Sequence, residues 1–219
     1  LEEMDNNYPI YSYLGFFLSK MKKSEKKALS MIKEMGGTIR TKDVLSQGIH
    51  RRTLYHLRDK GILTELSRGV YSLTSEPISN PDLVTIGRRV PQAVICLISA
   101  LSFHNITTQI PHQIYIAIAK DATPPRIDTP PLSVHKFSGE ALTAGIEEHQ
   151  IDGVPVKIYS IEKTLADCFK YRNKIGLDVC IEALKLYKAR KKINIQDIIK
   201  YAKICRVYKL MTPHLESIL

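Results

Sequence analysis

The chain has 219 residues, 44% of them hydrophobic, and this composition excludes a globally disordered protein. No run of about 18 apolar residues occurs, so the sequence predicts no transmembrane helix. The formal net charge of +10 is unevenly spread, with 13 lysines and arginines against 5 acidic residues at 20–71, 5 against 8 at 72–156, and 14 against 5 at 157–209. Two basic blocks around an acidic centre favour a polyanionic partner, with solvated helix faces as the alternative.

Residues 1–20 precede the first module with a readable pattern. The stretch from Ile10 to Leu18 is apolar, but it is short and contains Ser12 and Gly15. It follows acidic residues and lacks a basic n-region, so we do not interpret it as a signal peptide. We expect an ordered N-terminal extension that packs on the body of the protein.

Residues 21–75 have the element order of a winged helix-turn-helix. The predicted elements are a helix capped by Ser24 and running to about Met35, a short strand at 38–40, a short helix capped by Thr41, a turn at 47–49, a helix at about 51–60, and a hairpin of 62–66 and 70–73 around Ser67-Arg68-Gly69. Glycines follow the first and third helices and occupy the hairpin turn, where a left-handed backbone is needed.

The third predicted helix is the candidate recognition helix. At helical spacing Leu54 and Leu57 point into the core, and polar and basic side chains occupy the other side. The candidate DNA-binding residues are Lys42, His50, Arg51, Arg52, Tyr55, His56, Arg58 and, at the wing tip, Arg68. Arginine can bond guanine with two hydrogen bonds in the major groove, and a cation on a wing can enter the minor groove. The alternative is a basic surface helix in a winged helix that binds protein.

Residues 76–219 predict an α+β domain with a small β-sheet and a helical C-terminal half. The predicted elements are a helix from the Asn80 cap to about Arg89, a short helix capped by Ser99 and running to His104, strands at 113–119 and 132–137, a hairpin or bulged strand at 151–159 with Asp152-Gly153 as its turn, and helices near 160–171, 177–189, 195–203 and 207–218. The whole chain is therefore predicted to be α+β, with two domains after the extension.

Sites for chemistry are scarce in this second domain. His104 and His112 lie eight positions apart without a carboxylate or cysteine at ligand spacing, so we predict no metal and no cofactor. None of the common catalytic or phosphate-binding motifs is present, and we predict that the protein is not an enzyme. Asp152, Glu162 and Lys163 only faintly resemble a nuclease set, because the Glu-x-Lys spacing is missing; helix capping and local ion pairs explain the cluster at 160–167.

Two further features bear on location and partners. Four widely spaced cysteines, without a CxxC pair, predict buried free thiols in a reducing cytoplasm. A second basic patch comprises Lys185, Lys188, Lys191 and Lys192. This patch could add non-specific phosphate contacts, or it could face an RNA or a protein partner.

Several segments together resemble AbiEi-family antitoxins. The resemblance rests on Thr41–Leu45, Gly48–Tyr55, Lys60–Leu63, Arg68–Tyr71, Ser99–Leu101 with His104, Ile151–Val156 and Ser160–Asp167. It covers roughly Ser24 to the C-terminus, with residues 1–20 outside it. The family often has Arg where Lys163 stands, so no role is carried over to that residue.

The resemblance implies an abortive-infection antitoxin of the type IV class. It implies an N-terminal domain that binds double-stranded operator DNA and represses its own operon. It also implies a C-terminal domain that counteracts a nucleotidyltransferase-like toxin without a stable complex, and that takes part in phage defence. The competing interpretations are a non-enzymatic protein-binding module whose winged helix serves assembly and, less favoured, a divergent nuclease.

Overall fold

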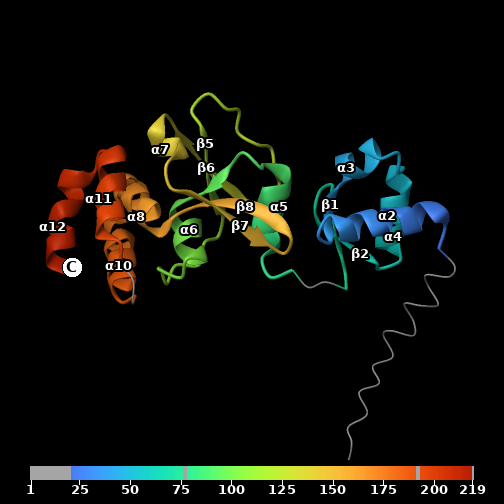
Figure 1. Ribbon diagram of the computed structural model, residues 1–219, viewed down its shortest axis with the longest axis horizontal. Coiled ribbons are helices and arrows are strands. Elements are labelled where there is room, and N and C mark those ends of the chain that lie inside the picture. Colours follow the sequence, from blue (N-terminus) through green and yellow to red (C-terminus); the bar gives the residue numbers. More distant parts are fainter. Residues whose placement is uncertain (1–20, 76–77, 191–192, 219) are drawn as a thin grey trace, which may run out of the picture. The chain divides into compact units, whose positions relative to one another are not determined.

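A computed structural model describes residues 21–75, 78–190 and 193–218 (Figure 1). It divides into two compact units: the first takes in 21–65 and 69–75, and the second takes in the short segment 66–68 and the described chain from Ile78 onward. The N-terminal extension expected at 1–20 lies outside the described residues. Among the described residues, no helix is both long and apolar enough to cross a membrane. Each unit is considered separately below.

The segment 21–75, most of which forms the first unit, follows the helix–strand–helix–helix–hairpin order of a winged helix-turn-helix. Its elements are α2 (Lys23–Glu34), β1 (Thr38–Arg40), α3 (Thr41–Ser46), α4 (Arg51–Asp59), β2 (Leu63–Ser67) and β3 (Val70–Leu73). The strands form a sheet of order β1-β3-β2, in which β1 and β3 are antiparallel. Gly48 and Gly61 have φ of +73° and +70°, so each supplies the left-handed conformation that turns the chain next to α4.

Two predicted helix caps in this unit are wrong. Helix α2 begins before Ser24, because the Glu25 carboxylate reaches back and accepts the backbone N–H of Lys22 at 2.9 Å. Thr41 is the first residue of α3 rather than its cap, and its hydroxyl and its backbone N–H donate to the Gly69 carbonyl. The Thr41 side chain therefore contacts the hairpin turn instead of closing its own helix.

The second unit is an α+β domain. Its elements are α5 (Pro81–Arg89), β4 (Val94–Ile95), α6 (Leu97–Phe103), β5 (Ile114–Ala119), β6 (Leu132–Phe137), α7 (Glu140–Thr143), β7 (Ile146–Ile151), β8 (Val154–Tyr159), α8 (Ile161–Lys170), α9 (Arg172–Ile175), α10 (Leu177–Lys188), α11 (Ile195–Ile204) and α12 (Tyr208–Ile218). The predicted cap at Asn80 is confirmed, and Ser160 and Asn194 cap α8 and α11 in the same way, because each side-chain oxygen accepts a backbone N–H three residues ahead.

The sheet of the second unit has the strand order β6-β5-β4-β8-β7. The β5–β6 and β4–β8 pairs are parallel, and the β4–β5 and β7–β8 pairs are antiparallel. Alternate residues of β5 enter two separate cores: Ile114, Ile116 and Ile118 pack with α5, and Ala117 packs with the C-terminal helices. This alternation is the two-residue period of a strand with both faces covered.

Two details of the second unit depart from the sequence prediction. The hairpin turn at Asp152-Gly153 is confirmed, but its first strand, β7, starts as early as Ile146. Ser99 does not cap α6, which begins at Leu97; its hydroxyl accepts the backbone N–H of Tyr115 at 3.0 Å and so joins α6 to β5. All four cysteines are buried free thiols, as predicted.

Candidate nucleic-acid interface

Helix α4 separates a buried side from an exposed polar side. Leu54 and Leu57 are completely buried in the core of the first unit. Arg51, Arg52, Tyr55 and His56 are exposed. The helix is amphipathic in the sense that a recognition helix requires, because its apolar stripe holds it on the body while its basic side faces solvent.

The start of α4 is held by a side chain that the sequence analysis placed among the DNA contacts. His50 Nδ1 accepts the backbone N–H of Arg52 at 3.2 Å, so His50 is the N-cap of the helix. The ring nitrogen left over, Nε2, is the one that can face a ligand. Lys42 is exposed on α3, the helix that precedes the turn.

Arg51 and Arg52 are the available cations of α4. Within the described part of the chain, neither guanidinium has an ion-pair partner. Both stand in the first turn of the helix, where recognition helices place their base contacts. A guanidinium without an internal carboxylate loses no salt bridge when it bonds a phosphate or a guanine.

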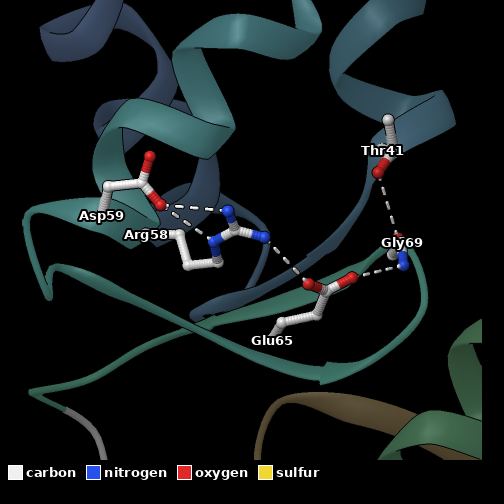
Figure 2. A network of polar contacts seen from close by, with 5 residues as sticks. All are labelled: Thr41, Arg58, Asp59, Glu65 and Gly69. Atoms are coloured by element: carbon white, nitrogen blue, oxygen red, sulfur yellow. Dashed lines mark hydrogen bonds and ion pairs between the residues drawn. The ribbon is translucent and has the colours of Figure 1, made fainter.

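The C-terminal end of α4 has its cations engaged in internal ion pairs. Arg58 bonds Asp59 at 3.0 Å and Glu65 at 3.3 Å (Figure 2), and the hydrogen bond to Asp59 is the main cause that raises the Arg58 pKa. Lys60 bonds the buried Glu25 at 2.8 Å, and this hydrogen bond lowers the Glu25 pKa. The two ends of α4 therefore differ, with free cations at its start and paired cations at its end.

The wing is the β2–β3 hairpin, and its turn is Arg68-Gly69. Arg68 is exposed. Gly69 has a φ of +78°, a conformation that favours glycine. Its N–H donates to Glu65 Oε1 at 3.1 Å. The eight sequence-predicted residues thus lie on α3, on α4 with its cap, and on the wing turn; seven of them belong to the first unit, and Arg68 is grouped with the second.

Sequence reasoning missed the acidic residues at this surface. The sequence analysis assigned no partner to Asp59 or Glu65, whereas both bind Arg58 directly. The only signal in the sequence was that acidic residues persist within a block of opposite charge. Nothing local pairs Arg58 with Glu65, because they lie on different elements seven positions apart.

The second basic patch is only partly described. Lys185 and Lys188 are exposed on α10, and Lys191 and Lys192 lie outside the described residues. The structure therefore leaves the role of this patch as a prediction.

The residues of the weak nuclease resemblance have separate partners. Lys163 bonds Asp167 inside α8, Glu162 accepts the Tyr187 hydroxyl at 2.6 Å, and Asp152 accepts from Ser79. His104 Nε2 lies 2.8 Å from the Tyr159 carbonyl oxygen. Across the described ranges, no three histidine, cysteine or acidic side chains gather as a metal site would require. The interpretation of the 160–167 cluster as capping and local ion pairing is confirmed at Ser160 and Lys163.

Two comparisons with known proteins found a match, one to a family of sequences and one to a solved structure. The family model of AbiEi antitoxin transcriptional regulators matches residues 31–74, which run from within α2 to the end of the wing. The fold resembles the crystal structure of the RV2827C protein from Mycobacterium tuberculosis, with a TM-score of 0.58, 14% identity, and coverage of 84% of this chain and 72% of that chain. No curated protein matches the sequence. The helix-turn-helix and wing of this chain therefore match the AbiEi antitoxin family of transcriptional regulators, the family that the sequence resembles.

Proposed function

We propose that this chain is a cytoplasmic, non-enzymatic repressor that binds double-stranded operator DNA of its own operon through α4 and the wing. The observation that carries the proposal is the pair of exposed arginines at the start of α4, Arg51 and Arg52, which have no ion-pair partner among the residues that the structure describes. In this arrangement α4 enters the major groove, and Arg68 on the wing meets a phosphate or the minor groove.

We further propose that the second unit is the antitoxin part. The support is the AbiEi description of the matching family and the resemblance of the Ile151–Val156 and Ser160–Asp167 segments. In this role the unit counteracts a nucleotidyltransferase-like toxin of the type IV class in abortive infection, without a stable toxin–antitoxin complex.

The repressor proposal is tested by titrating DNA from upstream of the reading frame with Arg51→Ala and Arg52→Ala. If they read bases, each should lose about 1–3 kcal/mol of specific binding, because the hydrogen bonds of a bidentate contact are removed. The matched control is Lys26→Ala, which removes an exposed charge of the same sign from α2. Circular dichroism should be unchanged, since neither arginine lies on the Leu54/Leu57 side.

If the double variant Arg51→Ala/Arg52→Ala keeps the wild-type affinity for the operator and an intact fold, α4 is not the helix that contacts the bases. If the wild type shows no salt-sensitive DNA binding at all, the alternative of a winged helix used for assembly takes its place.

The antitoxin proposal is tested by reversing Lys185, Lys188, Lys191 and Lys192 to glutamate in the full chain. Growth after co-expression with the cognate toxin reports neutralisation, and operator titration reports DNA binding. Loss of operator affinity with neutralisation retained assigns the patch to DNA, and the opposite result assigns it to antitoxicity. Failure of the wild-type chain to protect against a toxin encoded beside it would contradict the antitoxin proposal.

A further inference from the structure

We infer that Glu65 is a positioning residue for DNA recognition, and that with Arg58 it holds the wing turn in register with α4. The inference rests on the proposed DNA-binding function and deepens it. It assigns a role in specificity to an acidic residue on a surface that would otherwise be expected to repel DNA.

The carboxylate of Glu65 uses its two oxygens for two different elements. Oε2 accepts from Arg58 Nη1 on α4 at 3.3 Å, and Oε1 accepts the N–H of Gly69 in the wing turn at 3.1 Å (Figure 2). The other guanidinium nitrogens of Arg58 are occupied as well, because Nε and Nη2 both donate to Asp59 Oδ1. The guanidinium of Arg58 is thus held by Asp59, on the same helix, while its Nη1 bonds Glu65.

The other side of the same turn is held by α3. The Gly69 carbonyl accepts from the backbone N–H of Thr41 at 2.9 Å. It also accepts from the Thr41 hydroxyl at 3.4 Å, the contact drawn in Figure 2. The Gly69 residue is therefore bonded at its N–H through Glu65 to α4 and at its C=O to the start of α3. Both helices of the helix-turn-helix anchor the wing turn.

This geometry gives a reason for a carboxylate beside the DNA-binding surface. If Glu65 were only a surface charge, it would weaken binding to every DNA sequence by repulsion. As a positioning residue it instead holds the wing turn at Gly69 to α4 before DNA arrives. A preorganised surface loses less conformational entropy on binding, and it discriminates between grooves of different shape.

The two roles make opposite predictions for Glu65→Gln. With a positioning role, this variant should bind its operator more weakly than the wild type and lower the ratio of operator to random-sequence affinity by about tenfold. Arg58→Lys should have the same effect, because an ammonium keeps the charge for a phosphate but cannot span Asp59 and Glu65 as the planar guanidinium does. Combined, the two changes should be non-additive by at least about threefold.

A readout without DNA tests the anchoring directly. Selective ¹⁵N-glycine labelling of the full chain gives signals from 11 glycines. The signal of Gly69 is identified as the one that disappears in Gly69→Ala. Glu65→Gln and Arg58→Lys should each increase the fast motion of the Gly69 amide. Glu34→Gln, which removes an exposed carboxylate from α2, is the charge-matched control and should leave that signal unchanged.

Three results separate the possibilities. Higher affinity of Glu65→Gln for all DNA, with the Gly69 signal unaltered, would show that Glu65 only repels and would overturn the inference. The inference would also be overturned if Arg58→Lys kept the wild-type ratio of operator to random-sequence affinity while the wild type itself bound the operator. This second result does not depend on whether Glu65→Gln folds. Absence of DNA binding by the wild type would instead defeat the proposed function, and the glycine signals would still decide whether the pair anchors the wing.

Discussion

The Nζ atom of Lys163 lies 2.5 Å from Asp167 Oδ2 one turn along α8, and both side chains are completely buried. The ammonium also lies 4.1 Å from the ring centroid of Tyr159 and 5.1 Å from that of Phe137. The other carboxylate oxygen of Asp167 accepts from the Cys205 thiol at 3.2 Å. The ion pair of α8 therefore contacts β6, β8 and the C-cap residue of α11 within the apolar core of the helical half.

Lys163→Met and Asp167→Leu are each expected to lower the free energy of unfolding by about 3–5 kcal/mol, because each leaves the other charged side chain buried without its partner. The double change Lys163→Met with Asp167→Leu should cost much less than the sum, since apolar residues replace both charges. Urea unfolding followed by circular dichroism measures this. Additive losses would show that the two side chains do not act as a pair.

The stability of the second unit should fall when the pH is lowered from about 7 to 5. Burial lowers the pKa of His104 and His135 below the ordinary value, with contributions at His104 from His149 and Arg190 and at His135 from Lys174. The folded protein then binds fewer protons than the unfolded chain below a pH of about 6.5, so acid favours unfolding. Urea midpoints across this range measure the effect.

His104→Gln is expected to reduce this pH dependence, because its amide can still donate to the Tyr159 carbonyl but does not titrate. His112→Gln is the matched control, since His112 lies in a partly exposed loop of the same unit. An equal reduction in both variants would contradict the assignment to His104.

Gly87→Ala should destabilise the protein, although helix propensity alone predicts a gain of about 1 kcal/mol. A Cβ at Gly87 would lie 2.9 Å from methyl groups of Val154 and Val156 and 3.0 Å from the Pro155 carbonyl oxygen. Overpacking against these stiff neighbours should cost about 1–3 kcal/mol. A raised thermal midpoint would show that α5 can move away from β8 without loss.

Arg68→Ala should weaken DNA binding by a similar factor for all sequences, because a wing contact with phosphate or the minor groove carries little base information. The slope of log K against log salt should decrease by about one unit, as one phosphate contact is lost. Comparing operator and random DNA at several salt concentrations measures both effects. Retention of the wild-type slope would place Arg68 away from the DNA.

Most of the helices and the exposed side of α4 could be predicted from sequence because their signals are local, whereas the four-residue helices α7 and α9 were not predicted. The caps at Asn80, Ser160 and Asn194 form within one turn of the helices they begin. The spacing of Leu54 and Leu57 alone orients α4. Such features depend on residues a few positions apart, so no knowledge of the rest of the chain is needed.

Strand β7 shows where prediction from local sequence patterns failed. It is an edge strand in which Glu147, Glu148 and Gln150 are exposed, so it lacks the alternation of apolar residues that marks a half-buried strand. Its hydrogen bonds to β8, rather than its composition, make it a strand. The two-residue β4 was missed for the related reason that it gives too little pattern to detect.

Local patterning by itself determined the winged-helix order of elements, the basic exposed side of α4 and the four buried thiols. The partners of the polar groups were decided only by the tertiary structure. Arg58 bonds Glu65, Ser99 bonds Tyr115, and Thr41 bonds Gly69 because folding brings separate elements together. Hydrophobic periodicity records which side of an element is buried, but a hydrogen bond depends on distances of about 3 Å between atoms, which exist only once the elements have packed.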